Sequence, residues 1–289
     1  MNVGLVGNND GPLYLLRAMR ECDLEPVCVG LQNLPSEAVQ QAYASASPLH
    51  LFTGFDEDKL VERLRSMNLD LLVNAFCNFR FDRLLNQPYD ALNLHLAPLP
   101  RYRGRHPLQW ALINGESQFG VSIHQMTSSW DAGPVMWQQM VPVDDGMSVA
   151  RLRGRLMNAV TAKFGAFLHA YARGDATPLP KNDADATYVA RRFSEDSALT
   201  DWSDHAFVIR KVMALRSESY PAYLTVGDTH VTTRAAHALS RRYVGLAAPF
   251  VCGVHESSLD VVCLDGQTVR FSELQPTSPD VALNDRVKL

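Results

Sequence analysis

The stretch "NVGLVGNNDGPLYLLRAMRECDLEPVCVGL", residues 2–31, decides the fold class. Residues 2–7 form a short apolar run that predicts a buried strand, and a polar turn follows it. From Pro12 to about Glu21 the apolar residues recur at helical spacing, and residues 26–31 form a second apolar run. A strand, a helix and a second strand predict a crossover connection, which places the two strands parallel in one sheet.

The same alternation continues through the first half of the chain. Short apolar runs predict four more strands, at residues 48–53, 70–76, 91–97 and 120–126. Helical spacing predicts helices over residues 56–67 and 148–174, and Ser148 is the expected N-cap of the second. Together these elements predict an α/β fold: a Rossmann-like, doubly wound and mainly parallel sheet.

The second half of the chain has a different pattern. A polar segment with two prolines, residues 175–187, predicts a linker. An amphipathic helix pattern over residues 202–217 follows it, and then short β segments separated by turns. These segments predict a smaller, β-rich C-terminal domain shaped as an OB-like barrel. We therefore expect two domains, residues 1–185 and residues 186–289.

Composition narrows the class of protein. The 289 residues are 46% hydrophobic and 20% charged, with a formal net charge of -4, so the chain is not a polybasic nucleic-acid binder. Five cysteines at irregular spacing predict reduced thiols and no structural metal site. The N-terminus has no basic leader, and no apolar stretch approaches the length of a membrane span. We expect a soluble cytoplasmic protein with no membrane partner.

The glycine-containing turn at the N-terminus is a weak candidate for a dinucleotide site. Gly4, Gly7 and Gly11 do not follow the spacing of the dinucleotide fingerprint. The second strand also ends without the acidic residue that would bind the ribose. An ordinary strand–helix turn is the favoured interpretation.

A stronger candidate lies at the end of a later strand. Asn93 and His95 are two residues apart, so their side chains lie on the same face, and Asp131 follows another predicted strand. Ligands of open parallel sheets bind beyond the carboxyl ends of the strands. An imidazole that accepts a proton, an amide that binds an oxyanion and a carboxylate that orients the imidazole suit acyl transfer to an amine. From spacing alone, a hydrogen-bonded core histidine is the commoner interpretation of His95.

Residues 93–135 carry a longer motif: "NLHLAPLPRYRGRHPLQWALINGESQFGVSIHQMTSSWDAGPV". It resembles the signature of the folate-dependent formyltransferases, which combine Asn-x-His, an Arg-Gly loop, Pro-x-x-Trp, a Gly-Val strand ending in His, and Asp before Gly. Residues 70–80 resemble the family strand that lines the folate pocket. Residues 186–226 resemble the start of the C-terminal domain in methionyl-tRNA and aminosugar formyltransferases, so the resemblance covers most of the chain.

The resemblance implies a formyl transfer site in the domain of residues 1–185. The family's triad falls on Asn93 as oxyanion donor, His95 as base and Asp131 as the group that orients His95. The formyl donor would be N10-formyltetrahydrofolate, with no metal. The residues implied in binding its pterin are Phe76, Cys77, Asn78, Met126 and Trp130. The chain departs from the family pattern at Ala97, where a serine is usual, which affects loop hydrogen bonding more than the chemistry.

The expected acceptor is the primary amine of a nucleotide-linked aminosugar. Basic residues crowd around the active-site loop, and guanidinium groups suit a diphosphate. The candidate substrate contacts are Arg80, Tyr102, Arg103 and Arg105. Tyr102 or Trp110 would stack on the base, although both rings could equally fill the core, and a solvated, salt-bridged loop is the alternative for the arginines. The sequence of the loop resembles that of the sugar-nucleotide formyltransferases. Their substrates typically carry a 3- or 4-amino group on a sugar that is linked to dTDP, UDP or GDP.

Other acceptors stay open. Methionyl-tRNA is the first alternative, but residues 201–289 carry nine basic and ten acidic side chains, so a nucleic-acid partner is not favoured. An amino-acid or hydroxyornithine acceptor is a further alternative, and a non-catalytic folate- or nucleotide-binding protein is the alternative of another class. The intact triad argues against a non-catalytic protein. The resemblance to the sugar-nucleotide formyltransferases also implies a role in lipopolysaccharide or O-antigen biosynthesis and a homodimer.

Overall fold

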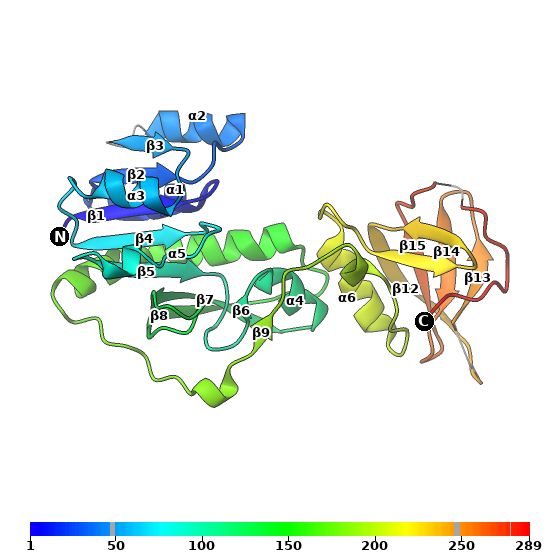
Figure 1. Ribbon diagram of the computed structural model, residues 1–289. Helices are drawn as coiled ribbons and strands as arrows, with labels where there is room; N and C mark the ends of the chain where they lie inside the picture. Colours follow the sequence, from blue (N-terminus) through cyan, green and yellow to red (C-terminus); the bar gives the residue numbers. More distant parts are fainter. Residues whose placement is uncertain (47–49, 246–248, 278) are drawn as a thin grey trace. The chain divides into compact units, whose positions relative to one another are not determined.

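A computed structural model describes residues 1–46, 50–245, 249–277 and 279–289. The chain divides into two compact units, and neither is continuous in sequence (Figure 1). The first unit comprises Met1–Gly104, Phe119–Val141 and Gly154–Val189. The second unit comprises Arg105–Gln118, Pro142–Arg153 and Ala190–Leu289.

The first unit contains a seven-stranded sheet of order β3-β2-β1-β4-β5-β7-β8. The strands are β1 (Val3–Gly7), β2 (Cys28–Leu31), β3 (Leu51–Thr53), β4 (Leu71–Ala75), β5 (Asp90–His95), β7 (Gln118–Gln125) and β8 (Val135–Pro142). The five strands from β3 to β5 pair in parallel, and β7 pairs antiparallel with β5. The predicted doubly wound, mainly parallel sheet is confirmed. In the strand expected over residues 48–53, residues 48 and 49 lie outside the described residues.

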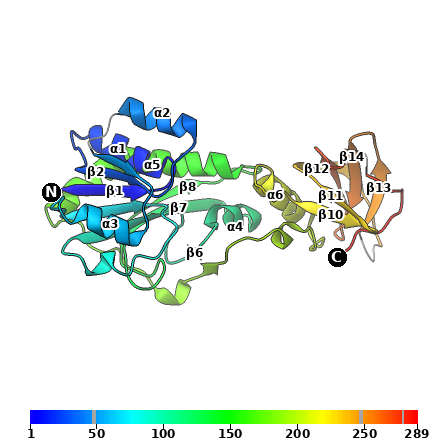
Figure 2. The same cartoon turned by 45° about the horizontal axis from the view of Figure 1, so that its top comes forward.

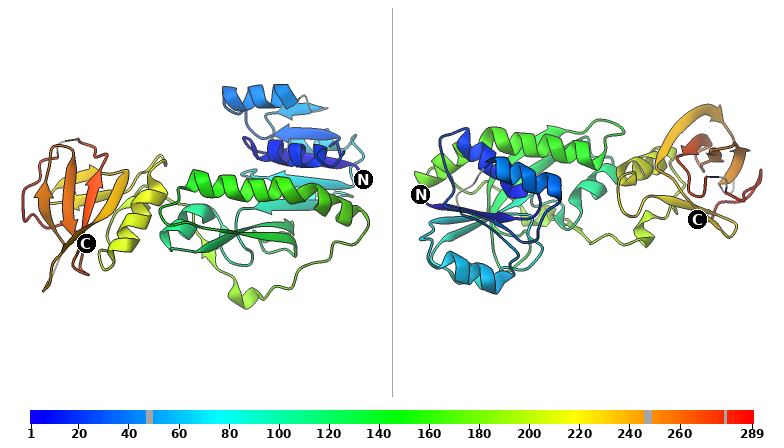
Figure 3. Two further views of the ribbon diagram at one scale, coloured as in Figure 1. Left: turned by 180° about the vertical axis from the view of Figure 1, so that it is seen from behind. Right: turned by 90° about the horizontal axis from the view of Figure 1, so that it is seen from above.

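Helices cover both faces of this sheet. They are α1 (Gly11–Arg20), α2 (Glu37–Ala46), α3 (Glu57–Leu64) and α5 (Val149–Ala172). In Figures 2 and 3, α1 and the part of α5 in the first unit lie on one face and α3 on the other. Leu60 and Leu64 of α3 are buried against Val6 and Leu72 of the sheet. A Cβ at Gly165 would lie 2.4 Å from the Cys22 sulfur, so the absence of a side chain lets α5 pack closely against the end of α1.

Helix ends follow the expected chemistry. The Asp56 side chain accepts a hydrogen bond from the Lys59 N–H at the start of α3. The Ser148 hydroxyl accepts one from the Arg151 N–H at 3.3 Å, in agreement with the predicted N-cap of α5. Among the described residues, no helix combines the length and the hydropathy that a membrane span requires.

The second unit is rich in β structure, as expected. Its elements are α4 (Pro107–Ile113), α6 (His205–Leu215), β10 (Tyr223–Val226), β11 (Thr229–Thr232), β12 (Ala235–Arg242), β13 (Phe250–Val254), β14 (Ser258–Val262) and β15 (Gln267–Ser272). An antiparallel sheet has the order β12-β15-β14-β13, and β10 and β11 form a hairpin. Single bridges join β13 to Arg286, Val287 to β10, and β11 to Gln275 just beyond β15. The sheet, the hairpin and these bridges together are consistent with a barrel-like arrangement of the strands.

The core of the second unit is built around Trp202. Its side chain is 1% exposed and meets the Phe271 ring edge-on, with 5.9 Å between the ring centroids. The indole N–H donates to the Leu199 carbonyl at 2.9 Å, so the one polar atom of this large side chain is satisfied.

Candidate active site

Three polar side chains form one row across neighbouring strands of the first unit. Asn74 of β4 pairs with Asn93 of β5, and Asn93 pairs with His124 of β7. The Asn74 amide donates to Asn93 Oδ1 at 2.7 Å, and Asn93 Nδ2 lies 3.0 Å from His124 Nε2. His124 Nδ1 lies 2.8 Å from the Gln125 carbonyl, so this nitrogen carries the hydrogen and Nε2 accepts from Asn93. The row fixes the direction of the Asn93 amide.

Asp131 joins this row from the loop that follows β7. Its backbone is left-handed, with φ 51°, which aspartate tolerates better than most residues. Its Oδ1 lies 3.5 Å from both Asn93 Nδ2 and His124 Nε2, and 3.7 Å from His95 Nδ1. Its Oδ2 accepts a hydrogen bond from the Gly104 N–H at 2.9 Å. The structure thus brings together all three predicted residues of the triad.

His95 is held at one ring nitrogen, Nε2. Its Nε2 lies 2.9 Å from the Tyr102 carbonyl, so Nε2 carries the hydrogen and donates it there. Burial lowers the pKa of His95, although Asp131 and the Tyr102 carbonyl act in the opposite direction. At neutral pH the ring is therefore neutral, and the lone pair of Nδ1 is on the side of Asp131.

Asp131 is ionised throughout the neutral range. Burial alone would raise its pKa, but the contacts with His124, His95 and the Gly104 N–H outweigh burial and lower the pKa to about 2. A fixed negative charge beside a neutral imidazole favours proton uptake by that imidazole. The pair therefore has the electrostatics of a general base.

The residues proposed for pterin binding lie in the two loops that follow β4 and β7. Phe76 is half-buried, and the Cys77 N–H donates to Asn74 Oδ1 at 3.2 Å. Met126 and Cys77 pack against the same buried apolar cluster, which includes Leu72 and Leu84. Burial raises the pKa of the Cys77 thiol, which disfavours the thiolate form.

The remaining two of these residues are exposed. The Asn78 N–H donates to Gln32 Oε1 at 2.7 Å, and its side chain faces solvent. Trp130 is 54% exposed, one residue before Asp131. An exposed aromatic ring and half-buried apolar side chains beside a polar row fit a flat heteroaromatic ligand with hydrogen-bonding edges.

The four residues proposed for substrate binding divide into two pairs. Arg80 is exposed and forms an ion pair with Asp82 at 2.7 Å, and Arg105 is also exposed. Tyr102 is only 5% exposed and meets the Phe119 ring edge-on. Arg103 is 4% exposed. Because their side chains are buried, Tyr102 and Arg103 are not placed to stack on a base or to bind an open diphosphate.

The loop around Ala97 has its own source of hydrogen bonds. The Ser122 hydroxyl donates to the Ala97 carbonyl at 2.7 Å and accepts from the Leu99 N–H at 3.1 Å. Gln138 donates to the Leu99 carbonyl and to Ser122, each at 2.9 Å. Ser122 and Gln138 thus bind the loop whose usual serine is replaced by Ala97.

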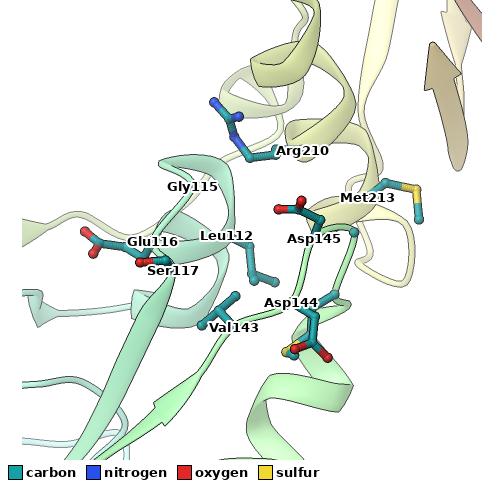
Figure 4. A pocket seen from close by; sticks show the side chains of 11 residues that line it. Leu112, Gly115, Glu116, Ser117, Val143, Asp144, Asp145, Arg210 and Met213 are labelled. Atoms are coloured by element: carbon teal, nitrogen blue, oxygen red, sulfur yellow. The ribbon is translucent and has the colours of Figure 1, made fainter.

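A pocket in the second unit is separate from these residues. It has a volume of about 450 Å³, including space open to solvent. Figure 4 shows its lining from the end of α4, residues 143–147 and α6. None of the residues predicted for catalysis, cofactor or substrate lines it.

Comparison with known proteins finds a family match for part of the chain. Residues 25–164, which include the triad, match the family model described as formyl transferase. The chain contains a formyl transferase domain. The family resemblance of the Asn-x-His and Asp-x-Gly motifs is thereby confirmed.

Solved structures share the fold of this formyl transferase domain and of the β-rich part. HypX from Aquifex aeolicus in complex with tetrahydrofolic acid is 21% identical with a TM-score of 0.63, covering 95% of this chain and 44% of that one. An N-formyltransferase from Helicobacter canadensis in complex with folinic acid and dTDP-3-aminofucose is 12% identical with a TM-score of 0.68, covering 94% and 99%. Methionyl-tRNA formyltransferase from Clostridium thermocellum is 15% identical with a TM-score of 0.56, covering 92% and 100%. The chain thus spans less than half of HypX.

The site residues predicted from the sequence did not include Asn74 or His124. The available signal was polarity: each is a polar residue near the end of a largely buried strand. Their alignment with Asn93 depends on strand order and register, which the linear sequence does not specify.

Proposed function

We propose that the protein transfers a formyl group from N10-formyltetrahydrofolate to the primary amine of a nucleotide-linked aminosugar. The observation that carries the proposal is the cluster of Asn93, His95 and Asp131 inside a formyl transferase domain. Structural neighbours with bound tetrahydrofolic acid, or with folinic acid and dTDP-3-aminofucose, support the cofactor and the substrate class.

The folate would supply an electrophilic formyl carbon. Phe76, Met126 and Trp130 would contact its flat pterin ring, and the backbone near Cys77 and Asn78 would bind the polar edge of the ring. These residues lie in loops beside the Asn74–Asn93–His124 row. No metal takes part in this assignment.

His95 would act as the base through Nδ1. The Tyr102 carbonyl holds the hydrogen on Nε2, which leaves the lone pair on Nδ1 for the proton of the attacking amine. Asp131, with its Oδ1 3.7 Å from Nδ1, would stabilise the imidazolium that forms. The negative charge of Asp131 thus stabilises His95 in its protonated form.

Asn93 would bind the negative charge that develops on the formyl oxygen. One of its two N–H bonds is engaged by His124 at 3.0 Å, whereas the contact with Asp131 is longer, at 3.5 Å. The second N–H is the one that an acyl oxygen would recruit. The bond from Asn74 holds the Asn93 amide in the required orientation.

The acceptor assignment rests on charge. Residues 201–289 carry one more acidic than basic side chain, which does not favour a long phosphate backbone. An exposed guanidinium group, such as that of Arg80 or that of Arg105, is suited to a phosphate of a diphosphate-linked sugar. A 3- or 4-amino sugar on dTDP, UDP or GDP fits this requirement, and such a product would enter lipopolysaccharide or O-antigen biosynthesis. We include a homodimer and a cytoplasmic location in the proposal.

The test compares acceptors directly. The protein is incubated with N10-formyltetrahydrofolate and either aminosugars linked to dTDP, UDP or GDP, or methionyl-tRNA, and products are analysed by mass spectrometry. We expect one added formyl group on a sugar nucleotide, and none with His95→Ala. Formylation of methionyl-tRNA alone would replace the acceptor assignment, and folate binding without any transfer would favour a non-catalytic binder.

A further inference from the structure

The segment at residues 181–189, whose residues 181–187 the sequence predicts to be part of a linker, is bonded to the active-site loop. We call it the strap. The Tyr102 N–H donates to the Thr187 hydroxyl at 2.8 Å, and the Arg103 N–H donates to the Thr187 carbonyl at 2.9 Å. Two short strands pair in parallel here, β6 (Arg103–Gly104) with β9 (Tyr188–Val189). Residues 187–189 of the strap therefore lie alongside residues 102–104 of the loop.

The approach of the two segments is close. Gly104 has φ 101°, and a Cβ there would lie 2.3 Å from the Val189 carbonyl oxygen. Tyr102 is also left-handed, with φ 60°, a conformation that costs free energy for a residue with a side chain. Surrounding bonds must hold such a backbone in place, and the strap provides two of them at Thr187.

The contacts of the loop connect the strap to the triad. The Tyr102 carbonyl and the Arg103 N–H belong to the same planar trans peptide, so they point in opposite directions. The N–H is bound by Thr187, and the carbonyl accepts from His95 Nε2. The next N–H, that of Gly104, donates to Asp131. Consecutive backbone groups thus bind the strap on one side and both members of the His95–Asp131 pair on the other.

The buried side chain of Arg103 anchors the strap. Its guanidinium is buried and donates to the Tyr188 hydroxyl at 3.0 Å and to the Asp183 carboxylate. Lys181 donates to Asp183 at 3.0 Å and to the carbonyl of Ala132, next to Asp131, at 2.6 Å. Asp183 and Tyr188 are exposed, so Arg103 is the buried end of this network.

We propose that Arg103 and Thr187 are positioning residues, which hold the Tyr102–Arg103 peptide so that its carbonyl keeps the hydrogen of His95 on Nε2 and leaves Nδ1 as the base. Arg103 thereby acts through the backbone and not on the substrate. The consequence for the reaction rests on the proposed function. The consequence for the tautomer of His95 does not.

The primary measurement is the tautomer of His95, read from the imidazole ¹⁵N chemical shifts, with His95→Gln identifying the signals. In the unaltered protein we expect the Nε2–H form. In Arg103→Met and Thr187→Val the Nδ1–H form should increase severalfold. Thr187→Ser keeps the hydroxyl and should restore the original spectrum. Arg173→Met removes an exposed arginine that pairs with Asp175 and serves as the matched control.

The second measurement is steady-state formyl transfer. We expect kcat to fall about tenfold in Arg103→Met, as for the loss of one or two hydrogen bonds, with KM for both substrates within about twofold. Unchanged tautomer and unchanged kcat in both variants would overturn the proposal. Thr187 is exposed, so Thr187→Val decides the matter if Arg103→Met does not fold. An absence of transfer in the unaltered protein refutes the proposed function and leaves the tautomer measurement valid.

Discussion

Replacement of Asp131 by asparagine removes one charge and little else. Asparagine has nearly the same shape, tolerates the left-handed backbone at this position, and can still accept the hydrogen bond from the Gly104 N–H. The negative charge lies 3.7 Å from His95 Nδ1. At an effective dielectric constant of about 20, a charge pair at that separation is worth about 4 kcal/mol.

That energy sets the size of the expected effect. If Asp131 stabilises the imidazolium formed during proton transfer, Asp131→Asn should lower kcat by up to about a thousandfold, since each tenfold corresponds to about 1.4 kcal/mol. KM should change little, because the charge acts on a cation that is absent from the ground state.

The assay is steady-state formyl transfer with the sugar nucleotide that the product analysis selects. Asp175→Asn, which removes an exposed carboxylate paired with Arg173, is the matched control and should retain full activity. Circular dichroism confirms that both variants are folded. A kcat within tenfold of the unaltered enzyme would show that Asp131 does not stabilise the imidazolium.

Three further outcomes follow from the same structure. Asn93→Ala should lower kcat about a hundredfold or more with little change in KM, measured by the same assay, because it removes the oxyanion donor. The pH–rate profile should fall on the acid side with a midpoint below about 6.5, because burial lowers the pKa of His95 while Asp131 and the Tyr102 carbonyl oppose the shift and His124 adds to it. In Asp131→Asn the midpoint should move to still lower pH, and a move to higher pH would contradict the electrostatic reasoning. Trp202→Ala should lower the free energy of unfolding of the second unit by about 3–5 kcal/mol in denaturant titrations, since it removes a side chain that is 1% exposed.

Local patterns were sufficient for the features that depend on neighbouring residues. The period of two along β5 placed Asn93 and His95 on one face, and the apolar runs separated by helices predicted the sheet. The N-cap at Ser148 was found for the same reason, because a cap involves residues only three positions apart.

Features that depend on distant residues could not be predicted in this way. The place of His124 required the antiparallel register of β7 against β5. Arg103 and Tyr102 were expected to face substrate, but their backbone pairs with residues about 85 positions later, and both side chains are buried. An arginine beside a catalytic motif has the same sequence signature whether it binds a phosphate or anchors a distant segment.

The strap also bears on how the chain can be divided. The first unit includes residues as far as Val189, and four of the last nine, Asp183, Thr187, Tyr188 and Val189, bind the loop that carries Tyr102, Arg103 and Gly104. A gene truncation or a protease cleavage between Asp185 and Ala186 would leave Lys181 and Asp183 on one fragment and Thr187 and Tyr188 on the other. A cut intended to isolate the formyl transferase domain with its active site belongs after Val189.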